Sequence, residues 1–537
     1  MKALSTVHSS LSTKSLSSRT VLLLTVVGAA ILLFPTIFWP FDYDQGTFAY
    51  GGSAILHGAK PYIDFWDIKP PNIFYTYATA FAIFGNSVQA IRIFDYLNAL
   101  LTVALIVALA FRLWKNTPWR LFSAVFASLI YVIQYYIFGH WDTAQAETYC
   151  VPLVLAALLL VVPRRAKFES ERLLTRALFA GVLVGATFYF KYPNALFLMP
   201  IAAALWQHSG HDRYAVVKAL SMMVVGFLAV IGVQSLYLYL NGELGPLYQL
   251  TMSSTASYVS TNYSGKFTLF QNLRTASQVV DLVWIAAAAF GWSIWITDRK
   301  QSAKHNFNVF RSLILLLLGA TVALLVVQLQ NKGYKYHYAV LLPWVDLLIG
   351  AGVGHIVKAM SSLDWLPKAV NAVLVAVGLV VLCYIWTSFH PLHERVEELV
   401  KISEGKQPAN GYIAGDSIAN YVSSHTRPSD RIFIFGFQPY VYWKTGRVPA
   451  TKFLNTIHFK PIAPPHEERD ELVHSLLGNP PTLFLVETDD RYTSQGNTND
   501  DSRTTIRLRF PELEQLLDYQ YWPEDTIQHT IIYRLRP

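Results

Sequence analysis

The sequence predicts a polytopic α-helical membrane domain followed by a small α/β domain outside the cytoplasm. Of its 537 residues, 53% are hydrophobic and 15% are charged, whereas a soluble protein is about 25% charged. Apolar runs near the ~20 residues that cross a ~30 Å hydrocarbon core recur between residues 20 and 387 and stop from about residue 388. We therefore expect a membrane domain over residues 1–388 and a soluble domain over residues 389–537.

The first apolar run follows a Ser-rich, basic segment without acidic residues, as a signal peptide does. The run over residues 21–38 is longer than the hydrophobic part of a signal peptide, and no small-x-small cleavage site follows it. We interpret this run as an uncleaved first span.

Eleven runs are predicted to span the membrane. They cover residues 20–38, 93–111, 121–139, 147–163, 177–190, 193–206, 219–240, 279–297, 312–328, 338–357 and 370–387. The apolar stretch 72–84 is too short to cross, so we expect it to lie in the interface or to dip into the bilayer.

Lys and Arg are concentrated in alternate loops, which places the N-terminus in the cytoplasm and the C-terminal domain outside. The formal net charge of +8 is explained by these loops, so nucleic acid is not an expected partner. The predicted location is the cell membrane, inner or plasma, with several passes.

The C-terminal domain shows one helical pattern, over residues 414–425, and three short apolar strands, over residues 431–436, 482–487 and 530–535. A helical pattern combined with short apolar strands favours a small layered α/β sheet. Cys150 and Cys383 both lie in apolar runs, so the chain has neither a disulfide framework nor a thiolate metal site.

The loop after the first predicted span is rich in ionisable residues, and it lies directly beside the bilayer. It holds the carboxylates and lysines Asp42, Asp44, Lys60, Asp64, Asp67 and Lys69. Residues 47–57 are compatible with a short helix on the membrane surface, with Asp44 at its start. An ordinary solvated polar loop is the alternative interpretation.

The loop resembles the first periplasmic loop of membrane glycosyltransferases of the C-type fold, in the bacterial branch related to protein O-mannosyltransferases and lipid A aminoarabinose transferases. The matching motifs are Asp44-Gln45-Gly46, Pro61-Tyr62 and Asp67-x-Lys69-Pro70-Pro71. The resemblance is specific in this loop and covers residues 20–390 in topology. It implies the C-type fold and transfer of a sugar from a polyprenyl or dolichyl phosphate to an acceptor on the outer side.

The resemblance also implies that Asp44 is the catalytic base. Such a base takes the acceptor proton while the phosphate leaves on the opposite face. Relatives often have Glu after this Asp, whereas this chain has Gln45, which weakens the case for a metal-binding carboxylate pair. Asp67 is the candidate for the second acidic group, one residue offset from the acid before Lys-Pro in relatives.

A donor-phosphate site is expected from Lys69, Lys191, Lys332, Lys335 and His337. Relatives carry a segment similar to residues 330–337 that is thought to hold the carrier phosphate. The alternative is an aromatic-belt loop with snorkelling lysines. For Lys191, a charge inside an apolar hairpin, a structural salt bridge is equally open.

Acceptor or sugar binding is assigned to Tyr62, Trp141, Asp142 and Glu147. For the two acids, stabilisation of a helix N-terminus by negative charge is an equal alternative. The aromatic segment 435–443 is either an acceptor groove or the edge where the soluble domain docks.

The predicted function is therefore an inverting hexosyl- or pentosyltransferase. Its partners are a polyprenyl-phosphate sugar donor, the lipid bilayer, and a glycan, lipid or protein acceptor. The alternative is a lipid-linked glycan flippase or transporter, which should have a polar site at the bilayer midplane. No Cys/His cluster suits zinc, and the sequence leaves open a divalent cation, Mg²⁺ or Mn²⁺.

Overall fold

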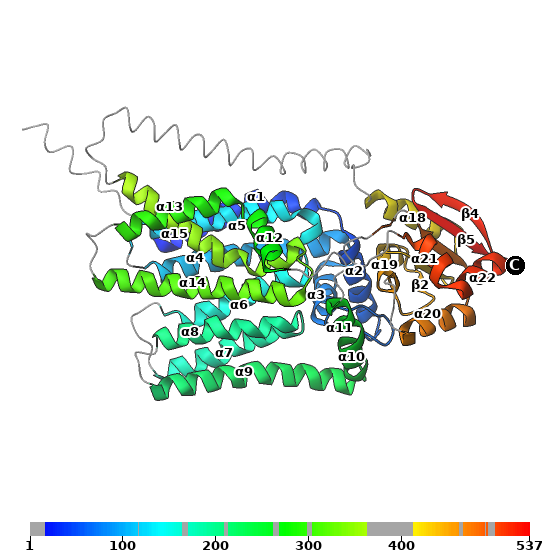
Figure 1. Ribbon diagram of the computed structural model, residues 1–537, viewed down its shortest axis with the longest axis horizontal. Helices are drawn as coiled ribbons and strands as arrows, with labels where there is room; N and C mark the ends of the chain where they lie inside the picture. Colours follow the sequence, from blue (N-terminus) through cyan, green and yellow to red (C-terminus); the bar gives the residue numbers. More distant parts are fainter. Residues whose placement is uncertain are drawn as a thin grey trace, which may run out of the picture.

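The computed structural model describes residues 17–115, 117–163, 170–208, 213–260, 268–297, 303–361, 412–460, 466–488, 490–491 and 500–537. The predicted span 370–387 and the predicted domain boundary at residue 388 lie outside these ranges. A bundle of long helices forms one end of the molecule, and an α/β domain lies at the other end (Figure 1).

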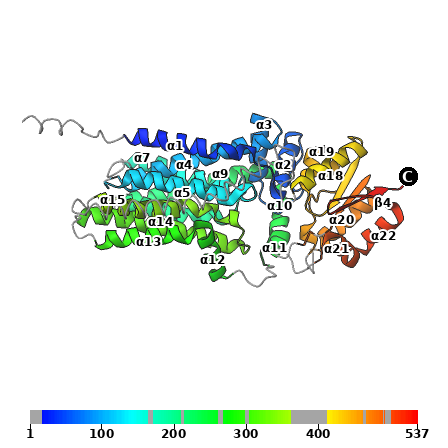
Figure 2. The same ribbon diagram turned by 90° about the horizontal axis from the view of Figure 1, so that it is seen from above.

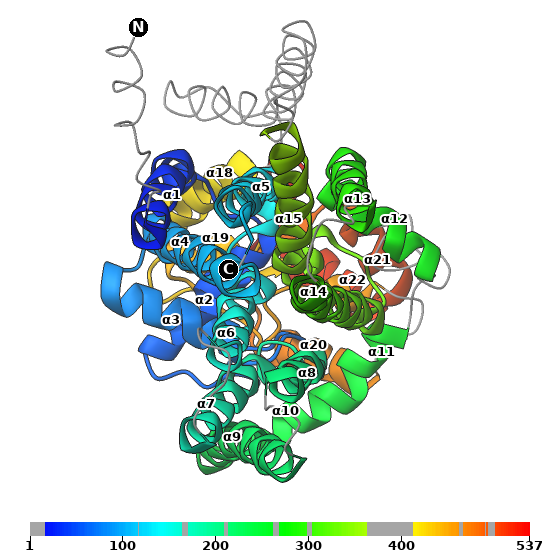
Figure 3. The ribbon, with the colours of Figure 1, turned by 90° about the vertical axis from the view of Figure 1, so that its left-hand side faces the viewer.

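The bundle consists mainly of long helices, which Figure 3 shows nearly end-on, together with short 3₁₀ helices. They are α1 (Ser18–Leu33) with η1 (Phe34–Phe38), α4 (Val88–Leu113), α5 (Arg120–Asp142), α6 (Ala146–Val161), α7 (Ser170–Phe188), η2 (Tyr192–Phe197), α8 (Leu198–His208), α9 (Arg213–Leu240), α12 (Leu269–Val280), α13 (Leu282–Thr297), α14 (Ala303–Gln330), η4 (Lys335–Val340) and α15 (Leu342–Ser361). In the end view, α7, α8 and α9 form one side of the bundle.

Five segments in the described part of the chain are long and apolar enough to cross a membrane. They are Ser18–Phe38, Val88–Leu113, Arg120–Asp142, Arg213–Leu240 and Phe307–Gln330. The bent pair Leu269–Val280 and Trp284–Ser293 gives up to six, and Ala146–Val161 and Leu342–Val357 are shorter apolar helices. The chain is an integral membrane protein, and the number of eleven spans stays a prediction.

Short helices cover the bundle end that faces the α/β domain (Figure 2). They are α2 (Tyr43–Leu56), α3 (Asn72–Phe84), α10 (Leu244–Leu250), η3 (Thr251–Thr255) and α11 (Ala256–Ser260). Helix α3 has the bounds of the apolar stretch that is too short to cross. The helix expected over residues 47–57 starts earlier, so Asp44 lies in the first turn of α2.

The C-terminal part is a layered α/β domain, as the sequence predicts. Its elements are α18 (Tyr412–His425), β1 (Arg431–Phe435), α19 (Pro439–Thr445), β2 (Val448–Pro449), η5 (Ile457–Phe459), α20 (His466–Gly478), β3 (Leu483–Glu487), α21 (Ser502–Arg509), α22 (Pro511–Gln520), β4 (Tyr521–Ile527) and β5 (Thr530–Leu535).

The sheet order is β2-β1-β3-β5-β4. Strand β1 pairs in parallel with β2 and β3, and β5 pairs antiparallel with β3 and β4. Phe433 lies opposite Phe484, and Leu485 lies opposite Ile532, so the centre of the sheet is apolar. The three central strands are those that the sequence predicts.

The α/β domain docks directly on the first loop and α2. The backbone N–H of Trp66 donates to the carbonyl of Lys452 at 2.8 Å. The Trp443 indole N–H donates to Asn86 Oδ1 at 2.7 Å, and the ring of Tyr43 stacks on Phe437 with centroids 5.2 Å apart. The aromatic segment 435–443 therefore lies at the docking edge, which is one of the two roles considered for it.

Candidate active site

A cavity of about 440 Å³ lies where the bundle, the first loop and the α/β domain meet. Nine residues predicted from the sequence to belong to the site line it: Asp44, Asp67, Lys69, Trp141, Asp142, Lys191, Lys332, Lys335 and His337. These residues come from segments far apart in the chain, and the fold brings them together in one cavity. Tyr62 and Glu147 do not line this cavity.

The start of α2 is held by Gln45, which is fully buried. Its side-chain oxygen accepts from the Asp42 N–H at 2.5 Å, as in a capping box. Its side-chain amide donates to the carbonyls of His140 and Thr143, both at 2.8 Å. Gln45 therefore fixes the first turn of α2 against the turn between α5 and α6, with the neighbouring Asp44 at the cavity wall.

Asp44 and Lys69 form an ion pair across the first loop. Asp44 Oδ2 lies 2.8 Å from Lys69 Nζ, and the two side chains are 22% and 11% exposed. Burial alone lowers the pKa of Lys69, but the charges of Asp44 and Asp67 outweigh it and raise that pKa above its ordinary value. Lys69 is therefore a stable cation at neutral pH.

Asp67 lies beside this pair in the turn that carries Lys69. Its Oδ1 accepts from the Lys69 backbone N–H at 2.9 Å. Burial raises the pKa of Asp67 to about 6, although Lys69 acts in the opposite direction. Asp67 is thus an acid that titrates close to neutral pH.

Tyr62 has a different position from the predicted sugar contact. It is buried, its hydroxyl donates to the Lys69 carbonyl at 2.8 Å, and it lines a second cavity of about 430 Å³ beside α20. Its placement makes it a residue that holds the loop of Asp67 and Lys69.

Glu147 is buried outside the cavity lining and pairs with Lys191. The Lys191 ammonium is 3.0 Å from Glu147 Oε1 and donates to Gln330 Oε1 at 3.1 Å. Glu147 is 1% exposed, so this carboxylate is not open to an acceptor. The structure thus supplies the salt-bridge partner that the sequence left open for Lys191.

Segment 330–337 forms another part of the cavity lining. Lys332 lies over the ring of Tyr258, 4.0 Å from its centroid, and burial lowers the pKa of Lys332 to about 8. Burial also holds the pKa of His337 well below its ordinary value, so this imidazole is neutral. Lys335 and Trp141 are exposed at the cavity rim.

Four lining residues come from the α/β domain: Phe437, Asn455, Ile457 and His458. Phe437 belongs to the aromatic segment considered as an acceptor groove, and no sequence pattern pointed to the other three as site residues. They reach the cavity only because the domain docks on the first loop. Asn455 and His458 lie among other polar residues of the same segment, such as Lys452 and Thr456, so no local pattern marks them.

The carboxylates at the cavity do not form a metal-ligand set. Within the described ranges, no group of three or more His, Cys, Asp or Glu side chains is placed to hold a metal ion. Asp44 pairs with an ammonium group, and the side-chain oxygen of Gln45 is used by a backbone N–H.

The long helices, the short helices on one end and the docked α/β domain have the arrangement of the C-type fold of membrane glycosyltransferases. The family model "Dolichyl-phosphate-mannose-protein mannosyltransferase" matches residues 68–237. No curated protein sequence matches the chain at a significant level.

Two solved structures are similar over nearly the whole chain. One is ArnT from Cupriavidus metallidurans bound to undecaprenyl phosphate, with 12% identity and a TM-score of 0.55, covering 95% of this chain and 97% of that chain. The other is the oligosaccharyltransferase AglB from Archaeoglobus fulgidus with an inhibitory peptide and a dolichol-phosphate. It has 10% identity and a TM-score of 0.50, covering 96% of this chain and 74% of that chain.

Proposed function

We propose that this protein transfers a sugar from a polyprenyl-phosphate donor to an acceptor on the extracytoplasmic face, with inversion at the sugar carbon. One observation carries the proposal: a carboxylate at the start of α2 and four lysines line one cavity at the end of the bundle. Undecaprenyl phosphate and dolichol-phosphate, the lipids bound in the two similar structures, support a lipid-phosphate donor.

In this mechanism Asp44 is the general base. Its carboxylate accepts the proton of the acceptor hydroxyl as that oxygen attacks the sugar carbon that bears the phosphate. The bond from this carbon to the phosphate oxygen breaks, and the lipid phosphate leaves with the electron pair. Lys69 holds the carboxylate in place through the 2.8 Å ion pair, and Gln145 lies 3.4 Å from the same oxygen.

The lysines on the other walls stabilise the negative charge that grows on the leaving phosphate. Lys191, Lys332 and Lys335 line the cavity together with Lys69. Cations placed in advance around a developing anion lower the barrier without reorganisation during the reaction. The lipid tail of the donor would extend along the apolar bundle.

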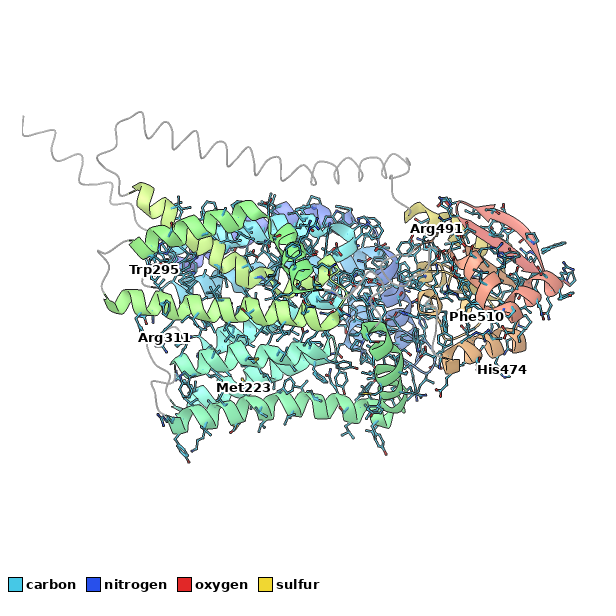
Figure 4. The ribbon with its side chains drawn as sticks, in the orientation of Figure 1. Met223, Trp295, Arg311, His474, Arg491 and Phe510 are labelled. Atoms are coloured by element: carbon cyan, nitrogen blue, oxygen red, sulfur yellow. The ribbon has the colours of Figure 1, made fainter. Side chains whose placement is uncertain are left out.

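The position of the cavity favours chemistry at one membrane surface. It lies at the bundle end that carries the α/β domain, whereas a transporter site is expected near the bilayer midplane. Figure 4 shows Arg311 of α14 at the opposite end of the bundle. Basic residues at that end support its assignment to the cytoplasm.

The test is sugar transfer by purified protein in vesicles supplied with polyprenyl-phosphate sugars and a cell-envelope acceptor extract. Asp44→Asn should reduce transfer by about a thousandfold while binding of undecaprenyl phosphate persists. Asp64→Asn is the matched control, because Asp64 lies in the same loop, is exposed and lines neither cavity. Full transfer by Asp44→Asn would contradict the proposal.

A further inference from the structure

The α/β domain contributes only uncharged residues to the cavity, whereas the lysines and aspartates that line it come from the bundle and the first loop. Four lysines and four aspartates line the cavity from the bundle and the first loop. The α/β domain contributes Phe437, Asn455, Ile457 and His458. Lysines suit the charged phosphate of the carrier, whereas uncharged polar side chains suit the hydroxyl groups of a sugar.

Asn455 is the most informative of the four residues. It is 2% exposed, and it lines the cavity. Its side-chain Oδ1 has no hydrogen-bond partner among the described residues. Buried polar atoms in folded proteins are nearly always paired, so this oxygen is placed to accept from a group that enters the cavity.

His458 lies on the same segment and packs between two aromatic rings. Its ring centroid is 5.1 Å from that of Trp66 and 5.8 Å from that of Tyr258. Burial, with help from the charges of Lys69 and Lys332, lowers the pKa of His458 to about 3. The neutral imidazole offers one donor and one acceptor, which suits a hydroxyl group better than a phosphate.

The segment that carries both residues is fixed at both ends. The Thr456 N–H donates to the Gly436 carbonyl at 3.0 Å. Lys460 forms a buried ion pair with Asp490 at 2.5 Å, and the Lys452 carbonyl accepts the backbone bond from Trp66. Asn455 and His458 are therefore held in place before a ligand arrives, as a recognition site requires.

We propose that Asn455 and His458 form a carbohydrate subsite that binds hydroxyl groups of a sugar in the cavity and so determines specificity. The proposal rests on the proposed function and adds the residues that read the sugar. The hydroxyls could belong to the donor sugar or to an acceptor sugar, and the two sources share this chemistry.

The experiment uses the full chain in vesicles and two kinds of probe. The first is undecaprenyl phosphate without a sugar, and the second is undecaprenyl phosphate linked to mannose, glucose, galactose or N-acetylglucosamine. The variants are Asn455→Ala and His458→Phe, which retains an aromatic ring between Trp66 and Tyr258. Asn420→Ala is the control, because Asn420 is exposed on α18 and does not line the cavity.

If the donor sugar is read here, both variants lose about tenfold or more in affinity for a sugar-loaded carrier and keep their affinity for undecaprenyl phosphate. If an acceptor sugar is read, donor affinities stay unchanged, and the half-saturating amount of cell-envelope extract rises at least tenfold.

The proposal is overturned if both variants match Asn420→Ala in every measurement. Equal losses for the loaded and the sugar-free carrier would also overturn it, because they would show a merely structural role. A wild type that binds these carriers but transfers no sugar defeats the proposed function. The donor-binding comparison still decides the role of Asn455 in that case.

Discussion

Lys69 Nζ lies 2.8 Å from Asp44 Oδ2, so the predicted base and a predicted phosphate ligand contact each other directly. Lys69 also lies 4.5 Å from the ring centroid of Phe48, on the next turn of α2. A cation in this position orients the carboxylate and can also stabilise charge on a donor phosphate in the same cavity.

Replacing Lys69 should therefore impair catalysis strongly, because the variant loses both of these roles. We expect Lys69→Met to reduce sugar transfer about a hundredfold, since removal of one preorganised electrostatic group costs about 3 kcal/mol. Lys69→Arg should retain part of the activity. Lys60→Met is the control, because Lys60 is exposed and its ammonium group donates to the Asn241 carbonyl, away from the cavity. Initial rates at saturating donor give the comparison.

The pKa of Asp67, raised to about 6 by burial, predicts a pH dependence. If transfer requires the carboxylate, its rate should fall about tenfold between pH 7 and pH 5 as Asp67 takes up a proton. Asp67→Asn should remove this inflection, and Asp64→Asn should retain it. An unchanged rate between these pH values would show that the ionised form is not required.

The raised pKa of Asp67 also makes the stability of the fold depend on pH, but in the opposite direction from the rate of transfer. The ordinary pKa of an aspartate is 3.8, so the folded state binds this proton more tightly than the unfolded state does. The contribution of Asp67 to the free energy of unfolding is therefore largest below pH 4 and is lost as the pH rises to about 6. Comparing wild type with Asp67→Asn by thermal unfolding at pH 5 and pH 7 isolates the contribution of Asp67 to the free energy of unfolding.

Variants of the buried pair of Glu147 and Lys191 distinguish a structural role of Lys191 from a catalytic one. Lys191→Met leaves the Glu147 carboxylate buried without its cation, which should cost about 3–5 kcal/mol of stability. The double variant Glu147→Gln and Lys191→Gln should recover most of that stability. If Lys191 also binds the donor phosphate, the double variant will still transfer sugar slowly. Recovery of transfer together with stability would assign Lys191 a structural role only.

Local patterns predicted much of the fold. The apolar stretch 72–84 became α3 with the same bounds, and the three apolar strands became β1, β3 and β5. Strand β4 was missed because its sequence includes Pro523, Glu524 and Asp525 and most of its residues are exposed at the sheet edge. Strand β2 has only two residues, which is too short for any periodicity.

The candidate site was predictable only where its residues share a loop or a motif. Asp67 and Lys69 are near neighbours in the chain, so their proximity follows from the sequence, whereas Asp44 meets Lys69 only because the loop after α2 returns to the start of that helix. The contacts of Glu147 with Lys191, and of Asn455 with the cavity, depend on tertiary packing between distant segments. No periodicity carries that information.

Gly46, directly after the capping Gln45, tests whether the docked domain is part of the active site. A Cβ atom at this position would lie 2.8 Å from the Tyr440 backbone nitrogen and 2.9 Å from Tyr440 Cβ. Gly46→Ala must therefore push α19 away from α2, at a cost of about 1–3 kcal/mol for overpacking. The helix itself would accept alanine, so the effect comes from the interface.

Gly245→Ala in α10 is the matched control, since a Cβ there meets nothing within 4 Å. If the α/β domain completes the cavity, Gly46→Ala should weaken binding of sugar-loaded carriers along with stability. Undecaprenyl phosphate without a sugar should lose less affinity, because the lysines that face its phosphate belong to the bundle and the first loop. A Gly46→Ala protein with wild-type sugar transfer would show that the domain can move without consequence for the reaction.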